Sequence, residues 1–573
     1  MNAATQPSTL KRNITNPLVV DALILVGLGL LAMAAFYVTP EFAANLPQDG
    51  VDFAVPAVNL LERGQYVLTA FGHSFPPQHP FGMSLLLVPV YALCGHALGN
   101  GIYAILLCAL GTIALTYFIG VKLGGRSCGI FAALFLITNY GFWQYSQKIM
   151  SEVPSTFFAT AALALSLSIR DRKRPALTCF AGGVAIGFMV AIRYDSIMMM
   201  APALLMLWEG PWTDRLRRAA FIVLGLAPWI ISLAIYHEIR FGSPLRTGYS
   251  LYTTGYKDSA HPMFSTRYIT TSSFLRTREI EARFTGMVEG NGFFYAKSLL
   301  TETDTTRVLG HPLYWQLPGR TIYQALALFR TALGIVGFLA CLPAWRPNYF
   351  RQRFLLWSVT SLLVTVSLYW VYFWQEERFL MRLVPLFCLA NGIGISELFA
   401  RWNARAVRAA LIVIPSALIA VFAFYNWQMG FPNGNDLHLY ETLTQAARQM
   451  ESNAVVVTNF DPFRIDAYLI RHTERLAVPL VPDKGVSLFI SGTSTQTSFH
   501  PFVALEHPER LQELLDSGRP VYWLINNPWS GQPFSEFNAL QKSFRLRVLA
   551  TASVNGGDDQ PYFGRIHELP KEH

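Results

Sequence analysis

Apolar runs close in length to a bilayer crossing recur along the first three quarters of this chain, and they constrain its fold more than any other feature. A helix needs about 20 apolar residues to cross the hydrocarbon core. Twelve runs approach that length, at approximately 17–38, 81–98, 101–120, 127–142, 153–169, 176–192, 196–209, 219–236, 321–345, 354–373, 379–398 and 409–428. The sequence therefore predicts a mainly α-helical, polytopic membrane protein.

The composition agrees with this class. Of the 573 residues, 52% are hydrophobic and 14% are charged, whereas a soluble chain is about a quarter charged. The net charge of +9 is spread over short Lys and Arg clusters between apolar runs, as the positive-inside rule expects. Because no basic domain or nucleic-acid-binding motif is present, we do not expect nucleic acid as a partner.

The basic clusters also indicate how many runs cross. If all twelve cross, 170–174 and most later clusters fall outside, against the positive-inside rule. If 81–98 re-enters or lies on the surface, the clusters become cytoplasmic at Lys11/Arg12, Lys122/Arg126, Arg170–Arg174, Arg215/Arg217/Arg218, Arg346/Arg351/Arg353 and Arg401/Arg405/Arg408. The sequence thus predicts about eleven spans, with the N-terminus inside and the C-terminus outside.

This topology divides the chain into three parts. We expect a cytoplasmic tail over 1–16, followed by an uncleaved signal anchor, and a transmembrane region over 17–429 with external loops 39–80 and 237–320. Residues 430–573 alternate short β-rich runs with helix-like segments, so they predict an extracytoplasmic α/β domain. Its strands are expected at 454–458, 486–490, 521–525 and 546–552.

The cysteines point to neither disulfides nor a metal site. All six lie in or beside apolar runs, at Cys94, Cys108, Cys128, Cys179, Cys341 and Cys388. No C-x-x-C spacing occurs among them. We therefore expect small apolar packing residues.

Candidate catalytic residues lie on the predicted external face. Asp49 and Asp52 follow the first span by about ten residues, although Asp-Gly is also a common turn pair that can cap a helix. Glu152 precedes Pro154 at the start of a predicted helix, where a carboxylate also suits the helix dipole. Taken alone, the aspartate pair favours a loop corner, and Glu152 fits a helix start and an acidic wall of a site equally well.

Basic side chains on the same face are candidate ligands for an anion. Arg193 lies between two runs beside Asp195, and charges near membrane depth are functional hypotheses by default. Glu377 and Arg378 form a charged group that an ordinary interfacial ion cluster would also explain. Arg330 lies inside a run and could face a polar cavity or extend outward.

Two further segments have weaker indications. His73 and His79 flank a proline-rich stretch whose spacing matches no metal-ligand pattern; a phosphate contact from His79 is a hypothesis, and plain loop structure is the simpler interpretation. Lys148 is a similar candidate. Gly183 and Gly187 form a small-xxx-small pattern that favours packing between spans.

These motifs resemble those of the GT-C superfamily of polyprenyl-phosphate-sugar-dependent glycosyltransferases. The similarity is to the branch of lipid A aminoarabinose transferases and protein O-mannosyltransferases, whose first external loop carries D-E-x-R-Y-A and then G-x-[WY]. Here the corresponding residues are Asp49-Gly50-Val51-Asp52-Phe53-Ala54 and Gly64-Gln65-Tyr66. The resemblance implies that Asp49 is the catalytic aspartate.

Other motifs follow in the family's order over roughly 17–430. Met150-Ser151-Glu152 resembles the acidic position before the fourth span, 241–249 resembles F-G-x-P-x-x-x-G-Y, and 377–385 resembles R-Y-L-x-x-x-x-P. The sequence departs from the family at Gly50, at Asp52, where arginine is frequent, and at 78–81, where Q-H-P-F replaces K-P-P-L. These departures suggest a different donor or acceptor from the aminoarabinose system.

The resemblance implies an inverting transfer from a polyprenyl monophosphate carrier at the outer leaflet of a bacterial inner membrane. Asp49 would act as general base. Arginine or lysine would stabilise the leaving phosphate, so no cofactor is required and a divalent metal, though possible, is not indicated. The candidate phosphate ligands are Arg193, Arg378, Lys148 and His79, and the residues expected to bind sugar hydroxyls or orient those bases are Asp52, Glu152 and Glu377.

A transporter or flippase of a lipid-linked or amphipathic anion is the competing interpretation. It explains the spans and the external arginines equally well. It does not predict the acidic loop or a large external domain, and the paired broken segments of inverted-repeat transporters are not evident. A receptor or scaffold that uses the C-terminal part is a weaker alternative. The sugar and the acceptor, whether lipid, glycan or protein, remain open.

Overall fold

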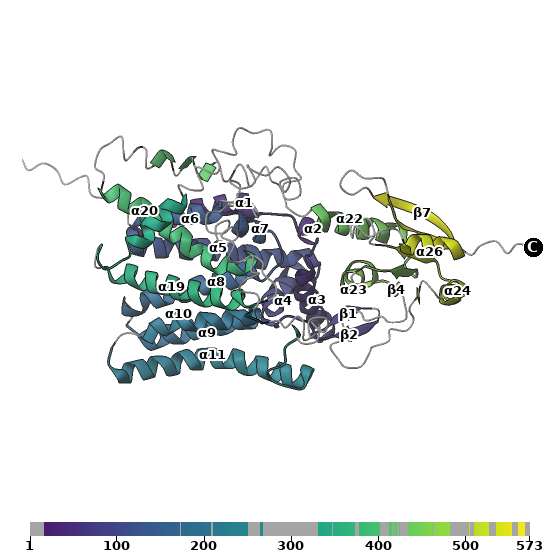
Figure 1. Ribbon diagram of the computed structural model, residues 1–573, viewed down its shortest axis with the longest axis horizontal. Helices are drawn as coiled ribbons and strands as arrows, with labels where there is room; N and C mark the ends of the chain where they lie inside the picture. Colours follow the sequence, from purple (N-terminus) through teal and green to yellow (C-terminus); the bar gives the residue numbers. More distant parts are fainter. Residues whose placement is uncertain are drawn as a thin grey trace, which may run out of the picture.

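The computed structural model describes most of the helical part and the core of the C-terminal part. The described residues are 17–249 except Phe71, Arg172 and 208–209; 264–266; 330–401 except 346–347 and 373–376; short pieces between 409 and 423; 434–481 except Asp461; 503–504; 509–525; 535–552; and 560–567. Helices run side by side at one end, the sheet and its helices lie at the other, and α2, α3, β1 and β2 lie between them (Figure 1).

The helical part contains both long helices and short turns. Its described α-helices include α1 (Pro17–Phe36), α2 (Pro40–Ala43), α3 (Gln48–Arg63), α4 (Gly82–Cys94), α5 (Ile102–Gly124), α6 (Arg126–Ile137), α7 (Tyr140–Tyr145), α8 (Glu152–Ser168), α9 (Pro175–Ile192), α10 (Met200–Ala203), α11 (Trp212–Phe241), a short helix over Arg330–Leu339, α19 (Tyr349–Trp370) and α20 (Val384–Arg401). Its 3₁₀ turns are η1 (Leu98–Gly101), η2 (Ile169–Asp171), η3 (Tyr194–Met199), η4 (Leu204–Leu207) and η7 (Glu377–Leu383).

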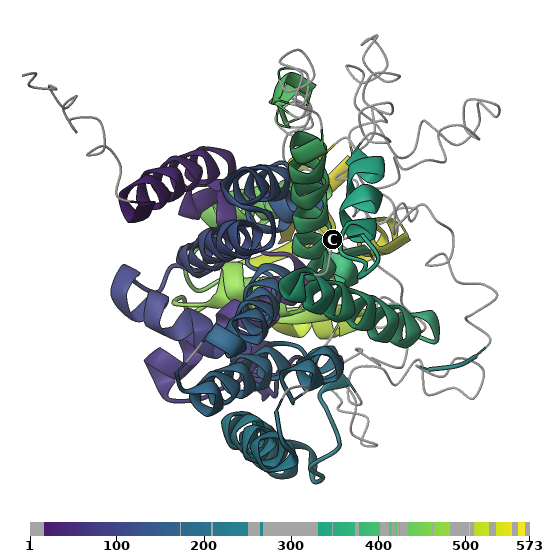
Figure 2. The same ribbon diagram turned by 90° about the vertical axis from the view of Figure 1, so that its left-hand side faces the viewer.

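The outer helices of this bundle expose apolar side chains. Leu18, Leu23 and Leu30 of α1 are 67–73% exposed. Only 11% of the apolar stretch of α1 is buried, whereas 72% of the apolar stretch of the helix at 378–401 is buried. Seen end on in Figure 2, α1 and α11 lie at the rim of the bundle. A helix that is apolar all round and exposed requires a lipid environment, which agrees with the predicted membrane class.

Six helices in the described part of the chain are long and apolar enough to cross a bilayer: 17–36, 98–124, 152–171, 175–192, 212–241 and 378–401. The predicted span 196–209 is instead a short stretch of consecutive 3₁₀ and α turns, η3, α10 and η4, over Tyr194–Leu207, and α6, which covers most of the predicted span 127–142, has only 12 residues. Helix α4 has 13 residues, which at about 1.5 Å each reach about 20 Å, short of the hydrocarbon core of about 30 Å. The total of about eleven spans stays a prediction.

Helices α9 and α11 pack closely through glycine. A Cβ on Gly183 would lie 2.2 Å from the carbonyl oxygen of Ile222, and one on Gly187 would lie 2.6 Å from the ring of Trp229. Only a residue without a side chain allows this approach. The predicted packing role of this glycine pair is confirmed.

The segment 39–80 is folded rather than being an open loop. Asp49 lies in the first turn of α3 and Asp52 lies further along the same helix, so the interpretation of this aspartate pair as a loop corner is wrong. A Cβ on Gly50 would lie 2.9 Å from the carbonyl oxygen of Ile149. This contact leaves no room for the second acid that the family usually has at this position. After α3, a hairpin of β1 (Leu68–Ala70) and β2 (His73–Phe75) leads to α4.

The C-terminal part is built on a six-stranded sheet of order β5-β4-β3-β6-β8-β7. Strands β3, β4, β5 and β6 pair in parallel, whereas β8 pairs antiparallel with β6 and β7. The elements are α22 (Gly434–Gln449), β3 (Val455–Thr458), α23 (Pro462–Ile465), the π-helical turn η8 (Asp466–Ile470), β4 (Leu476–Val481), β5 (Val503–Ala504), α24 (Glu509–Asp516), β6 (Val521–Leu524), α26 (Ser535–Ser543), β7 (Arg545–Ala552) and β8 (Gln560–His567).

Helices cover both faces of this sheet. Val456 packs with Leu443 of α22 on one face, whereas Val455 and Val457 pack with Leu511 of α24 on the other. Strands that are buried on both faces have nearly continuous apolar sequences. The sequences of β3 and β6 have this pattern. Strands β3, β6 and β7 coincide with three of the predicted strands, and the fourth, 486–490, lies outside the described residues.

The C-terminal part and the segment 39–80 are joined by specific polar contacts. The Tyr468 hydroxyl donates to the carbonyl of Ala44 (2.7 Å) and accepts from the backbone N–H of Leu46 (3.0 Å). Arg471 pairs with Glu62 at the end of α3, 2.8 Å apart. The C-terminal part therefore contacts the chain on both sides of Asp49.

The cysteines are free thiols, and five of the six are buried. This confirms the expected packing role at those five positions. Cys94 differs, because it is the last residue of α4 and is exposed.

Candidate active site

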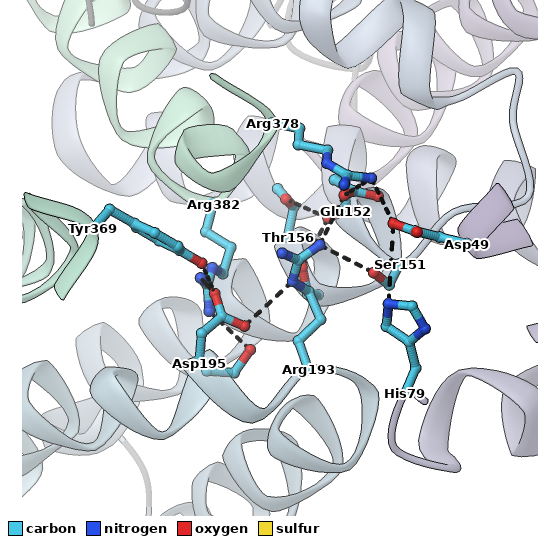
Figure 3. A network of polar contacts seen from close by, with 12 residues as sticks. Asp49, His79, Ser151, Glu152, Thr156, Arg193, Asp195, Tyr369, Arg378 and Arg382 are labelled. Carbon is cyan, nitrogen blue, oxygen red and sulfur yellow. Dashed lines mark hydrogen bonds and ion pairs between the residues drawn. The ribbon is translucent and has the colours of Figure 1, made fainter. Parts of the chain in front are cut away.

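Acidic and basic side chains from five separate segments meet at one place between the helices (Figure 3). They come from the first turn of α3, the residues just before α4, the first turn of α8, the end of α9 and the turn η7. The segments are far apart in sequence, and all belong to the face that the topology predicts to be external. Most of the predicted site residues are therefore brought together.

Two carboxylates of the site lie at helix starts. Asp49 is in the first turn of α3, and Glu152 is the first residue of α8. The unpaired N–H groups and dipole of a helix N-terminus favour negative charge there. The helix-start interpretation of Glu152 is thus confirmed, and from the position that suits the dipole its carboxylate also faces the arginines.

Arg378 links these two carboxylates. Its Nη1 lies 2.6 Å from Oδ2 of Asp49 and 3.7 Å from Oε1 of Glu152. Glu152 also accepts from Nη1 of Arg193 at 2.7 Å, and its side chain is 1% exposed. By contrast, the Asp49 side chain is 28% exposed, so Asp49 is the more accessible of the two carboxylates.

The network continues from Arg193 to Asp195. Nε of Arg193 lies 3.3 Å from Oδ1 of Asp195. Asp195 also accepts hydrogen bonds from Arg382 and from the hydroxyl of Tyr369. These contacts hold Arg193 from two sides and leave it aligned with Glu152.

On the other side of Asp49, His79 lies between two aspartates. Its Nδ1 is 2.9 Å from Oδ2 of Asp52, and its Nε2 is 4.0 Å from Oδ2 of Asp49. The backbone N–H of Gln78 also donates to Asp52, at 3.3 Å. Asp52 is thereby fixed beside the imidazole, although the sequence alone did not connect these two residues.

The segment after α11 closes over His79. The ring of Tyr249 lies 5.4 Å from the imidazole. A Cβ on Gly248 would lie 2.4 Å from the carbonyl oxygen of Gln78. The Gly-Tyr pair of the F-G-x-P-x-x-x-G-Y motif thus has a physical reason, because glycine allows the close approach and tyrosine packs on the histidine.

The pKa values of Asp49 and His79 are shifted in opposite directions. Burial raises the pKa of Asp49, but the positive charges of Arg378, His79 and Arg193 outweigh it, so its pKa is lower than usual. Burial lowers the pKa of His79, but the hydrogen bond to Asp52 and the charges of both aspartates outweigh it, so its pKa is higher than usual. An ionised Asp49 therefore stands beside an unusually basic imidazole.

Three other predicted residues have different environments. Lys148 lies at the turn before α8, with its ammonium group 5.5 Å from the centre of the Tyr145 ring. The side chain of Glu377 lies outside the part of the chain that the structure describes. Arg330 does not extend outward: it is fully buried and donates to the carbonyl of Phe135 at 2.9 Å.

Two residues of the network were missed from the sequence. Arg382 lies within the predicted run 379–398, and a charge inside such a run is a signal that would have found it. Tyr369 gives no comparable signal, because an aromatic residue near the end of a span is common. Among the described residues, no three His, Cys, Asp or Glu side chains are grouped so that they could hold a metal ion.

Known proteins resemble this chain in two segments of sequence and in overall fold. The model of the dolichyl-phosphate-mannose-protein mannosyltransferases matches residues 78–237, and that of the Alg9-like mannosyltransferase family matches residues 311–464. No curated protein sequence matches the chain. The first segment includes His79, Glu152 and Arg193, and the second includes Arg378.

Similar solved structures cover nearly the whole chain. ArnT from Cupriavidus metallidurans is 11% identical in the apo state, with 96% of this chain and 97% of that chain covered and a TM-score of 0.55. Its complex with undecaprenyl phosphate is 12% identical over the same shares, with a TM-score of 0.56. The Archaeoglobus fulgidus oligosaccharyltransferase, in complex with Zn and sulfate, is 12% identical, with 94% and 73% covered and a TM-score of 0.51. This chain is a multi-pass membrane protein with the GT-C fold, as its motifs predicted.

Proposed function

We propose that this protein is an inverting glycosyltransferase that moves a monosaccharide from a polyprenyl monophosphate to an extracytoplasmic lipid, glycan or protein. The observation that carries the proposal is the position of Asp49, a partly exposed carboxylate held 2.6 Å from Arg378 within a cluster of arginines. Support also comes from the similar ArnT, which was solved bound to undecaprenyl phosphate. The distribution of basic residues supports the external placement.

In the proposed reaction, Asp49 accepts the proton of the acceptor hydroxyl as its oxygen attacks the anomeric carbon. The new C–O bond forms as the bond from that carbon to the phosphate oxygen breaks, and the electron pair leaves with the lipid phosphate. A single displacement inverts the anomeric centre. Arg378 and Arg193 stand where they can stabilise charge on the leaving phosphate.

The test is transfer in proteoliposomes, with a panel of radiolabelled polyprenyl-phosphate sugars as donors and crude envelope extract as acceptor. We expect the wild type to move label from lipid to a new product and Asp49→Asn to abolish that movement, because the amide cannot accept the proton. Asp214→Asn is the matched control, since Asp214 is an exposed aspartate in the first turn of α11.

Each outcome separates the alternatives. Transfer by Asp49→Asn at a near-normal rate would remove Asp49 from the chemistry. Donor that crosses the membrane uncleaved, equally with both proteins, would instead support a transporter. Which labelled donor is cleaved would decide whether the sugar is a hexose or a pentose.

A further inference from the structure

We propose that His79, oriented by Asp52, is the proton store of the active site and receives from Asp49 the proton taken from the acceptor. This inference rests on the proposed glycosyl transfer and adds two residues to it. In the sequence the pair lies where the related family carries other residues, and a phosphate contact was the role expected for His79. The geometry points to a different role.

The first reason is the direction of the hydrogen bond. A carboxylate can only accept, so at 2.9 Å from Asp52 the Nδ1 of His79 must be the donor. In the neutral imidazole, the lone pair is then on Nε2. That nitrogen faces Asp49 at 4.0 Å. Catalytic hydrogen bonds are often long without bound substrate, so a small movement brings the two groups into contact.

The second reason is the limited ability of Asp49 to keep a proton. Arg378, 2.6 Å away, favours its ionised form. A general base of this kind can accept a proton in the transition state but must pass it on before the next cycle. His79 is the adjacent group that can take it.

The third reason is the charge of the described side chains of the network. Among these, four carboxylates, Asp49, Asp52, Glu152 and Asp195, face three arginines, Arg193, Arg378 and Arg382. The difference of one negative charge is the charge that an imidazolium at His79 neutralises. Of the groups that face the ring, Asp49 and Asp52 stabilise the imidazolium, Arg193 opposes it, and Phe53 and Tyr249 pack against it.

The proposed step accounts for the proton at each stage. The hydroxyl proton passes to an oxygen of Asp49 while the hydroxyl oxygen bonds to the anomeric carbon. It then moves to Nε2 of His79, which restores the carboxylate. The imidazolium keeps its Nδ1–H on Asp52 and releases the Nε2 proton to solvent or to the departing phosphate.

The first experiment is the pH dependence of transfer in proteoliposomes, with the full-length protein and a donor that the wild type cleaves. The wild-type rate should fall as the pH falls through the pKa of His79, because a protonated imidazole cannot accept. In Asp52→Asn that fall should move to lower pH by about one unit, since an opposite charge is lost. In His79→Gln the fall in rate through this pH range should vanish. The rate itself should be lower than that of the wild type by a factor of up to about 10².

His73→Gln is the matched control, because His73 is an exposed histidine on the neighbouring strand β2; it should keep the wild-type rate and profile. Monodisperse elution and unchanged thermal stability would show that His79→Gln is folded. If folded His79→Gln kept both the wild-type rate and the wild-type fall in rate on acidification, the proposal would be overturned.

A second measurement needs no donor. The twelve histidines are labelled with ¹⁵N, the protein is placed in nanodiscs, and the His79 signal is identified by its loss in His79→Gln. Its pKa should fall in both Asp49→Asn and Asp52→Asn, and an unchanged pKa in either would overturn the shared-proton arrangement. If no donor is cleaved by the wild type, the proposed function fails, and this titration still decides separately whether His79 is coupled to the two aspartates.

Discussion

At the level of single residues, Arg378 is the link between the two halves of the network. It contacts Asp49 and Glu152, two carboxylates that would otherwise repel each other across a partly buried space. Charge-assisted pairs of this geometry are stronger than neutral hydrogen bonds. Arg378 thus keeps Asp49 both ionised and in place.

Replacing Arg378 by glutamine should therefore raise the pKa of Asp49, because burial, which raises it, would remain while the nearest positive charge is removed. The carboxylate would then protonate at a higher pH, so the loss of rate caused by protonation of Asp49, which lies below the fall set by His79, should move to higher pH. We expect the rate of transfer to drop by about 10²-fold or more. The rate of Arg378→Lys should lie between those of the wild type and Arg378→Gln. The measurement is the pH–rate profile in proteoliposomes.

Arg240→Gln provides the control, since Arg240 is an exposed arginine near the end of α11 on the same predicted face. An unchanged profile in Arg378→Gln would show that Arg378 does not set the ionisation of Asp49.

At the level of elements, the site exists because helix ends meet. The start of α4 packs against the end of α9, where a Cβ on Gly82 would lie 2.4 Å from the carbonyl carbon of Ala191. His79 comes three residues before Gly82, and Arg193 comes two residues after Ala191. This one backbone contact therefore fixes the distance between the histidine and arginine sides of the site.

Gly82→Ala should force α4 away from α9, because backbone atoms cannot yield as a flexible side chain can. Overpacking of this kind costs about 1–3 kcal/mol, so we expect a lower midpoint of thermal unfolding together with reduced transfer. Gly29→Ala in α1, where a Cβ would meet nothing within 4 Å, should change neither. Wild-type stability and rate in Gly82→Ala would contradict the close packing described here.

At the level of the whole molecule, the segment 39–80 connects the helical bundle to the C-terminal sheet. Its α3 carries Asp49 at one end and, at the other, Glu62, which pairs with Arg471. A cavity of about 430 Å³ lies beside this junction, bounded by Glu41, Asn100, Tyr440 and Tyr468 among others. The C-terminal part thus contacts the segment that carries Asp49.

The predicted topology can be tested through Cys94, the exposed thiol at the end of the short helix α4. If 81–98 does not cross, Cys94 lies on the external face, so a membrane-impermeant maleimide added to intact spheroplasts should label the protein. Cys94→Ser should abolish labelling, because the other five cysteines are buried. Labelling only after the membrane is opened would place Cys94 inside and favour twelve spans.

The sequence by itself determined the membrane class, the GT-C resemblance and several members of the site. Those conclusions rest on local patterns: run length, the placement of basic residues, and short motifs around Asp49, Glu152 and Arg378. It also predicted that Gly183 and Gly187 pack between spans, because small residues at helical spacing have one common use in membranes; that α11 is the partner came from the structure.

Only the tertiary structure decided how these residues are paired. The Asp52–His79 hydrogen bond joins residues 27 apart in sequence, and the place of Arg382 beside Asp195 joins residues 187 apart. No periodicity or spacing encodes such pairs, because the distance between two helix ends is set by backbone packing such as that of Gly82 on Ala191.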